Sequence, residues 1–551
     1  MMTAMKAEKP YSYRLEIQKN RKSYSGVIRS SYREAGKVKH RNHGRLSGLP
    51  LEELKMLQAA FRGEVVLKGS TESLRTEDSK EYGASYALLE LAKAIGLDKA
   101  IYSRVSELWV QDALAMIVGR LVYAGSKLSL SNEWRNTTLW ELCGVKGKVD
   151  VEAHCYASMD RLFERQQAIQ RTLAKKHLGE GSLVLYDITS SYFEGEYEQS
   201  EIAAFGYNRD SKRGYEQMVI GLLCNEEGCP VGVEVFAGNT QDATTVMDKI
   251  IEIQQQYAIQ KIIFVGDRGM VTPSNYEKLK QKTGVQVISA LTHPQIQELI
   301  DREVIQVSLF RTGEVVEVLE PDGEEERYCL CKNPQTARRE HQTRKQLIEE
   351  TSKHMARIAN TRRKSTAEQL GARVGKSLAK YKVGKFFAWK VAEGKLIWEV
   401  NQAKVQTEQQ MDGCYIIRSN VSPQKLSKEQ VVASYKKLQA VEMAFRNLKT
   451  VQLEVRPVFH KTDDRIRCHV FICMLAYYLQ WHLKQKLQPL FEGDGQHKHR
   501  QWTLQNVLNC LATIRQEKAS INGVTFAHRT TPNQEQKYIL QLIGIKMLPC
   551  A

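Results

Sequence analysis

A mixed α/β fold, with helices packed on the faces of a sheet, is the fold class that the sequence predicts. Residues 182–290 predict the order strand, strand, strand, helix, strand, helix, strand, because short apolar runs alternate there with amphipathic segments. Residues 83–180 instead repeat their apolar positions at helical spacing, as in ASYALLELAKAIGL. Residues 296–413 interrupt this pattern before a further helix begins after Ser427. The sequence therefore predicts a sheet-based core, divided by an insertion and flanked by helical segments.

The strands of this core are apolar runs bounded by turn residues. The first is SLVLYDIT, and QMVIGLLCNEEGCPVGVEVFAG supplies two more around a turn at 225–228. An amphipathic helix is expected from Thr240, with Asp242 as an acid in its first turn. The strands KIIFVGD and VQVISAL follow, separated by a helix over TPSNYEKLKQKTG. Ligands in such sheets bind at the carboxyl ends of the strands, so the strand ends are the first candidates for a site.

Composition and pattern divide the chain into six segments. These are a basic N-terminal DNA-binding region (1–70), a helical domain (71–180), the first part of the core (181–295), a β-rich basic insertion domain (296–413), the second part of the core (414–485) and a C-terminal helical region (486–551). The insertion is predicted to hold strands over 304–310, 314–320 and 327–333, a basic helix, and a hairpin over 386–403. An unstructured loop of this length would be unusual inside a compact domain.

The charge of the chain is concentrated in two blocks. Lys and Arg number 80 against 63 Asp and Glu, a net charge of +17. Residues 1–50 hold 12 basic and 3 acidic residues, and residues 331–390 hold 16 and 4. Such clustering is typical of a surface that binds a polyanion, and the alternative is a solvated basic face without a partner. The alternating cations of KVKHRNHGRL favour phosphate contacts, so double-stranded DNA is the expected partner.

Membranes and disulfides are not expected. No apolar run approaches the roughly 20 residues that a membrane span needs, and the N-terminus has no hydrophobic leader segment, so a cytoplasmic location is predicted. The 11 cysteines are odd in number and scattered, with no pair spaced as CxxC. They are interpreted as small buried apolar residues of a reducing compartment, and a zinc site is not expected.

Two carboxylates end two of the apolar strands. Asp187 follows SLVLY and Asp267 follows KIIFVG. Burying a carboxylate at a strand end is costly unless it is paired or binds a cation. Two such acids, on strands expected to be neighbours, favour a shared cation site.

A third acid lies in the helix that starts after Ser427. Ser427 and Gln430 form a capping-box pattern, and the helix is expected to run over SKEQVVASYKKLQAVEMAFRNLKT. Tyr435, Leu438, Glu442, Phe445 or Arg446, and Lys449 recur on one of its faces. An acid on a face otherwise built from Tyr, Leu and Phe is unusual, and the alternative is a surface glutamate without a role.

Three carboxylates from two strands and one helix are able to hold two divalent cations about 3.5–4 Å apart. One ion would activate a water or a 3′-hydroxyl, and the other would stabilise the leaving oxygen of a phosphodiester. Mg²⁺ is the expected ion because it prefers oxygen ligands, and Mn²⁺ is expected to substitute for it. Without cations, the three carboxylates would raise one another's pKa values.

The sequence resembles DDE-type insertion-sequence transposases with a ribonuclease H-like catalytic core, in the branch with a Tyr-x2-Arg-x3-Glu-x6-Lys signature. YKKLQAVEMAFRNLK supplies Tyr435, Glu442 and Lys449 at those spacings. YDIT matches the segment around the first acid, Asp187, and VGDRGM the segment around the second, Asp267. The resemblance covers about 180–480. It departs at the signature arginine, where this chain has Leu438. Arg446, one turn beyond Glu442, is a candidate replacement, and Lys437, with a rotated approach, is the alternative.

The resemblance implies roles for several further residues. Tyr435 and Lys449 are implied to contact the backbone of the transposon end, and the insertion to hold the terminal base pairs. Trp389 or Trp398 would stack a flipped base, although packing of their hairpin is the simpler role. Lys212 and Arg213, in a loop near Asp187, are candidate DNA contacts. By contrast, His460, His469, Asp463 and Asp464 are expected to be structural.

The predicted function is that of a DNA transposase. It would bind terminal inverted repeats, cleave the 3′ end of the element in a metal-dependent step, and join the freed 3′-hydroxyl to target DNA. Joining two ends requires two active sites, so a synaptic dimer is expected. Two alternatives remain: a nuclease or junction resolvase of the same fold that does not join strands, and a catalytically inactive DNA-binding derivative.

Overall fold

The computed structural model describes residues 13–20, 23–34, 37–62, 74–209, 212, 214–320, 326–361, 365–451, 453–492, 502–521 and 524–546. These residues form two compact units. One contains the described residues of Met1–Lys80 and Arg515–Thr531, and the other contains Glu81–Ile514 and the described residues of Pro532–Met547. The mixed α/β class predicted from the sequence is confirmed.

The first unit holds two small antiparallel sheets. Its elements are β1 (Tyr13–Lys19), β2 (Tyr24–Glu34), β3 (Lys37–Ser47), α1 (Leu51–Phe61), β4 (Leu74–Glu81), β15 (Arg515–Ile521) and β16 (Val524–Arg529). β1, β2 and β3 form a meander against which α1 packs through the buried Leu54. The hairpin of β15 and β16 pairs with β4, in the order β16-β15-β4. The C-terminal region 486–551 was predicted to be helical; its residues 515–529 instead form this hairpin, because pairing with β4 decides their structure.

A helical part opens the second unit. It consists of α2 (Gly83–Ala94), α3 (Leu97–Ile101), α4 (Leu108–Val122), α5 (Lys127–Asn132), α6 (Leu139–Leu142), α7 (Ala157–Glu164) and α8 (Gln166–His177). α4 is almost wholly buried and packs against α2, α7 and α17 (Asp463–Lys486). Among the described residues, no single helix has the length and apolarity to cross a membrane; one pair bent by 101°, Leu108–Val122 with Lys127–Arg135, passes on length and composition alone.

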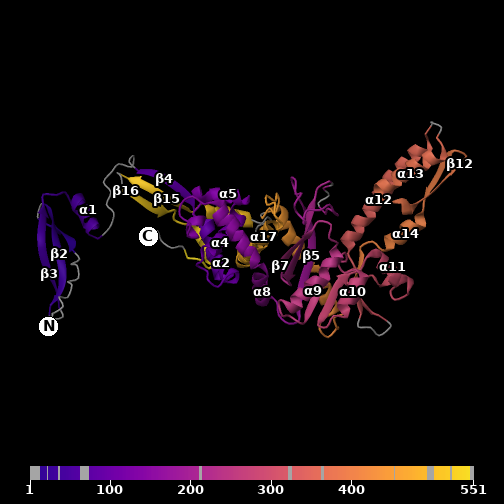
Figure 1. Ribbon diagram of the computed structural model, residues 1–551, viewed down its shortest axis with the longest axis horizontal. Helices are drawn as coiled ribbons and strands as arrows, with labels where there is room; N and C mark the ends of the chain where they lie inside the picture. Colours follow the sequence, from indigo (N-terminus) through magenta and orange to yellow (C-terminus); the bar gives the residue numbers. More distant parts are fainter. Residues whose placement is uncertain are drawn as a thin grey trace. The chain divides into compact units, whose positions relative to one another are not determined.

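An eight-stranded mixed sheet is the centre of the second unit (Figure 1). Its strands are β5 (Ser182–Tyr192), β6 (Gln217–Asn225), β7 (Pro230–Ala237), β8 (Ile262–Gly266), β9 (Val285–Ala290), β10 (Val316–Leu319), β11 (Arg327–Lys332) and β14 (Cys414–Ser419). Their order is β10-β11-β14-β9-β8-β5-β6-β7. β5, β8 and β9 are parallel, and β6 and β7 continue from β5 as antiparallel strands.

Alternate residues of β5 face two separate hydrophobic cores. Val184, Tyr186 and Ile188 pack against α9 (Thr245–Gln255) and α10 (Pro273–Lys280). Leu183 and Leu185 lie in the larger core with α4, α16 (Leu438–Arg446) and α17. Helices therefore cover both faces of the sheet, as the apolar pattern of this strand on both faces requires.

The segment 296–413 differs from the β-rich domain that was predicted. It contains α12 (Pro334–Ala359), α13 (Ala367–Tyr381), β12 (Phe387–Ala392), β13 (Lys395–Val400) and α14 (Gln402–Gln410), after the end of α11 (His293–Asp301). Helices dominate it, and α12 alone has 26 residues. Residues 304–310 form only a short 3-10 turn, Val307–Leu309, instead of a strand. β10 and β11 extend the main sheet beside β14, because the edge of β14 offers unpaired backbone groups to them. The hairpin β12–β13 was predicted correctly.

The helices after the insertion complete the fold. They are α15 (Lys428–Lys436), α16, a π-helical turn (Asn447–Val451), α17, α18 (Gln488–Glu492), α19 (Leu504–Ala512) and α20 (Gln534–Ile543). Ser427 caps α15 in a capping box with Gln430, as predicted. The single helix expected over 427–450 is instead divided at Lys437 into α15 and α16. The buried face of α16 packs on the sheet and contacts β5.

Candidate active site

Asp187, Asp267 and Glu442 line one cleft of about 300 Å³, here called the carboxylate cleft. The other residues that line it are Asn333, Tyr415, Tyr435, Lys436, Leu438 and Gln439. Tyr186 of β5 is in register with Gly266, the last residue of the parallel strand β8, and an aspartate follows each of them. Asp187 was predicted at the end of its strand but lies within β5, because pairing with β6 continues the strand to Tyr192. Both acids lie on the face of the sheet that α16 covers, because Leu183 and Leu185 on β5, and Ile263 and Val265 on β8, belong to the core on that side.

The amphipathic helix α16 brings Glu442 to this edge of the sheet. Its residues Leu438, Val441, Ala444 and Phe445 are buried in the core, whereas Glu442 is exposed to the cleft. Apolar packing thus holds the buried face of α16 against the core, and Glu442 lies at the border of that face. The structure brings together the three acids that the sequence analysis selected.

The negative charges of the cleft affect one another. The pKa of Asp187 is raised from 3.8 to about 6, mainly by burial and in addition by the charges of Asp267 and Glu442, while a hydrogen bond from the backbone of Ile188 opposes the rise. Arg209 acts in the opposite direction on Asp187. Burial and neighbouring acids favour the protonated form of a carboxyl group. A bound cation would favour its ionised form instead.

This pKa leads to a prediction about stability. Because the folded-state pKa of Asp187 is raised, ionising it costs more in the folded protein, so stability falls as pH rises from about 4 to about 6 and stays lowered above. In EDTA at pH 7, the free energy of unfolding of the Asp187→Asn variant should therefore be up to about 3 kcal/mol higher than that of the unsubstituted protein, at 1.36 kcal/mol per pKa unit. Urea unfolding measures this difference, which should nearly vanish at pH 4, and a variant no more stable at pH 7 would contradict it.

Tyr435 and Arg209 are polar neighbours of the acids. The Tyr435 hydroxyl donates a hydrogen bond to Oδ1 of Asp267, at 3.1 Å, and burial together with this carboxylate raises the pKa of Tyr435. Arg209 forms an ion pair with Asp242. Asp242 lies beside the site, since a Cβ atom built on Gly269 would be 3.8 Å from a carboxylate oxygen of both Asp242 and Asp267. Asp242 is thus the partner of Arg209 as well as the acid before α9 that the sequence analysis expected.

The other predicted DNA contacts that the structure describes lie outside the lining of the cleft. Lys212 is exposed in the loop after β5, with Nζ 5.9 Å from the centre of the Tyr192 ring, and Arg213 lies outside the described residues. Arg446 is exposed and Lys449 is half-buried, and each interacts with another part of the chain. Leu438, at the position of the signature arginine, is buried against the core.

Sequence reasoning missed the two cations nearest the carboxylates. Lys436 lines the cleft, whereas the neighbouring Lys437 is held by Glu226 at 2.8 Å. Arg209 lies near Asp187, and its backbone amide donates to Ser190 of β5. The signal available for Arg209 was its place in the basic loop that follows the first acid, but no spacing rule distinguishes it from the other cations of that loop.

The histidines interpreted as structural are packed in the interior. His469 is buried, with Nδ1 3.0 Å from Nζ of Lys127 and Nε2 3.1 Å from the carbonyl of Val455. Burial lowers the pKa of His460 to about 3, so this imidazole is neutral at pH 7. Asp463 begins α17 and accepts hydrogen bonds from the Ser200 hydroxyl and the Glu201 amide.

Trp389 and Trp398 face each other across the β12–β13 hairpin. They line a shallow pocket of about 300 Å³ on the hairpin surface, and Trp389 is 41% exposed. Trp398 packs against Phe387, at 6.0 Å between ring centres, which is the packing role considered for it. Base stacking by Trp389 stays a prediction.

Comparison with known families identifies the class of protein. A family model described as the transposase DDE domain matches residues 179–479, more than half of the chain. The chain belongs to this family. No curated protein matches it. The transposase domain runs from the residues before β5 into α17 and includes the carboxylate cleft and the whole of the insertion.

Membership supports a transposase function. It implies an enzyme of the nuclease and transesterification class, which generally uses divalent metal ions. It also implies DNA as the partner and, usually, an oligomer.

Proposed function

We propose that this transposase binds the terminal inverted repeats of an insertion sequence, cleaves the 3′ ends of the element, and joins them to target DNA. The observation that carries the proposal is the convergence of Asp187, Asp267 and Glu442 in one cleft within the DDE domain. Asp187 lies within β5, Asp267 directly follows the parallel neighbouring strand β8, and Glu442 comes from a helix more than 170 positions further along the chain. We assign the catalytic role to these three residues.

The topology of the sheet supports a ribonuclease H-like core. In the order β7-β6-β5-β8-β9, three antiparallel strands are followed by two strands parallel to β5. Asp187 lies on the central strand of this set and Asp267 directly follows its parallel neighbour. β14, β11 and β10 are then an extension of that core, through which the insertion is attached.

The residues of the cleft fit Mg²⁺. All three acidic donors are carboxylate oxygens, which this ion prefers, and the pKa of Asp187 is raised mainly by burial and in addition by the two neighbouring carboxylates, both of which a bound cation would offset. Asp187, Asp267 and Glu442 would hold two ions, with Mn²⁺ as an alternative. Bound metal would supply Lewis-acid activation of the attacking oxygen and of the leaving oxygen.

Neighbouring side chains would orient the acids and the phosphate. The hydrogen bond from Tyr435 holds the Asp267 carboxylate in one orientation, which is the function of an outer-shell partner. Lys436 lines the cleft. Arg268 is exposed beside Asp267, and its charge opposes the rise in the pKa of Tyr435. We infer that these two cations take over the phosphate contact that Leu438 cannot make.

The DNA would be held by two basic surfaces. Lys37, Lys39 and Arg41 alternate along the fully exposed part of β3, so their side chains project from one face. Arg338 and Arg339 are exposed in the first turns of α12, whose cap, Asn333, lines the carboxylate cleft. The positive end of the α12 dipole is thereby directed at the edge of the site, where it favours an anion.

Strand transfer with pre-cut ends tests the proposed function. Duplexes of the element's end, already cleaved at the 3′ strand, are incubated with the protein, Mg²⁺ and a supercoiled target plasmid. Joined product that requires the terminal 3′-hydroxyl is expected, and a 3′-dideoxy end is the matched control. Hydrolysis of uncut ends without any joined product would instead assign the chain to the nucleases, and binding without either reaction would indicate an inactive derivative.

A further inference from the structure

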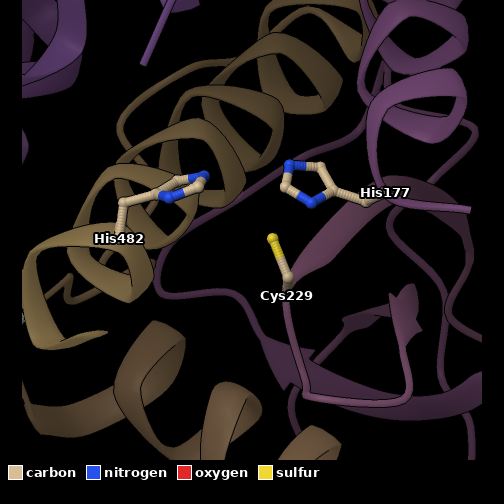
Figure 2. Close-up of side chains that lie close together, drawn as sticks. All are labelled: His177, Cys229 and His482. Carbon is tan, nitrogen blue, oxygen red and sulfur yellow. The ribbon is translucent and has the colours of Figure 1, made fainter. Parts of the chain in front are cut away.

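A second group of metal-binding side chains lies away from the carboxylates. His177 is the last residue of α8, Cys229 directly precedes β7, and His482 is in the last turns of α17. One ligand atom from each of these residues lies within 4.8 Å of the others. Figure 2 shows the Cys229 sulfur pointing toward the space between the two imidazole rings. Three separate elements thus converge on one point with soft and borderline donors.

The group has an unsatisfied donor or acceptor. Nε2 of His482 is buried and has no hydrogen-bond partner within the described residues. Leaving such an atom unpaired costs about 1–3 kcal/mol, which a bound ion would recover. His177, in contrast, is 2.9 Å from the Tyr478 hydroxyl through its Nε2, a contact that sets the orientation of its ring. Partners of this kind commonly hold metal-ligating histidines in place.

We propose that His177, Cys229 and His482 bind a Zn²⁺ ion, at a site separate from the carboxylate cleft. Two imidazoles and one thiolate are a ligand set that zinc prefers, with water as the fourth ligand. With metal–ligand bonds of about 2.0–2.3 Å, tetrahedral ligand atoms lie roughly 3.3–3.8 Å apart, so closure needs side-chain shifts on the order of 1 Å. The scattered cysteines gave no sign of this site, because its ligands are joined by folding and not by sequence spacing.

The protonation states are consistent with binding. Burial lowers the pKa of His177 and of His482 to about 4, so both imidazoles are neutral and able to ligate at pH 7. Burial raises the pKa of the Cys229 thiol above its ordinary value, and the charge of Lys176 offsets part of this rise. A coordinating thiol is deprotonated by the metal itself. The charge of Lys176 opposes a cation; its ammonium group donates to the carbonyl of Ile95 at 2.6 Å and to the Tyr478 hydroxyl at 3.3 Å.

The site would brace the turn between β6 and β7. Beside Cys229 in this turn, Gly228 leaves no room for a side chain against Ala440, because an added Cβ would lie 2.7 Å from the Ala440 Cβ. Glu226 of the same turn pairs with Lys437, at the start of α16. The carbonyl of Glu227 accepts a hydrogen bond from Trp481 of α17 at 3.3 Å. A metal at Cys229 would therefore fix the turn on which the helix of Glu442 rests.

Metal analysis of the full-length protein tests this proposal. Protein purified under reducing conditions, without chelator, should contain about one zinc per chain, and Cys229→Ala and His482→Asn should each lose it. Cys473→Ala, a buried cysteine of α17 outside the group, is the matched control and should retain it, as should Asp187→Asn. Zinc retained in both ligand variants would overturn the proposal.

Cobalt titration keeps the test independent of the folding of the variants. Co²⁺ added to the zinc-stripped, unsubstituted protein should produce a thiolate-to-cobalt charge-transfer band that saturates at one equivalent and is abolished by Zn²⁺ but not by Mg²⁺. Absence of this band in a protein that retains its circular dichroism spectrum would refute a thiolate-containing site. Neither readout depends on transposition, so failure here leaves the proposed function untouched.

Discussion

Asp187→Asn should reduce DNA cleavage and strand transfer by at least about a thousandfold while leaving binding to end DNA intact. The asparagine keeps the shape of the side chain but removes the charge that would hold the metal beside the middle of β5. Lewis-acid stabilisation by such a metal amounts to several kcal/mol, and a loss of about 4 kcal/mol corresponds to about 10³ in rate. Single-turnover cleavage of a labelled end duplex measures the rate, and a mobility-shift assay measures binding.

The matched control is Asp464→Asn, which removes an exposed aspartate at the start of α17. It should cleave at nearly the unsubstituted rate. Glu442→Gln should show the same loss as Asp187→Asn, since both residues line one cleft. Cleavage at the normal rate by either variant would show that the reaction takes place elsewhere on the protein.

Replacing Lys37, Lys39 and Arg41 together with Gln should produce the largest effect on DNA affinity. If each of these side chains neutralises one phosphate, each substitution should lower the slope of log affinity against log salt by about 0.9, and the three together by about 2.7. When the salt concentration rises fourfold, from about 50 to about 200 mM, both proteins should lose affinity for DNA. The fold-loss of the triple variant should be roughly 40 times smaller than the fold-loss of the unsubstituted protein. Fluorescence anisotropy with end DNA at several salt concentrations measures this slope.

The control for this experiment removes the same charge elsewhere. Lys146, Lys148 and Lys175 are exposed in the helical part of the second unit, and their triple substitution with Gln lowers the net charge equally. The slope should then stay nearly unchanged. If both triple variants lower it equally, the overall charge of the protein governs binding, and β3 is not a DNA-binding surface. All six side chains are exposed, so neither set should disturb folding.

The failures of the sequence analysis share one physical cause. Residues 515–529 were predicted to be helical, and β10 and β11 were predicted as strands but of the insertion domain and not of the main sheet. The place of each of these short segments depends on a pairing partner elsewhere in the chain. Local pattern indicates that such a segment is apolar or alternating, but the edge on which it pairs is decided by tertiary contacts. The same holds for Lys436, which lines the cleft from the last turn of α15, and for Arg209, which lies near Asp187 in a loop.

The sequence by itself determined the core strands and the face of each strand on which its aspartate lies. In SLVLYD and KIIFVGD the alternation of side chains already places Asp187 on the side of Leu183 and Leu185, and Asp267 on the side of Ile263 and Val265. Only the tertiary structure decided that the two strands are parallel neighbours in matching register and that α16 covers this same face with Glu442 at its border. Packing of apolar surface sets that arrangement, and it acts between segments that no local spacing connects.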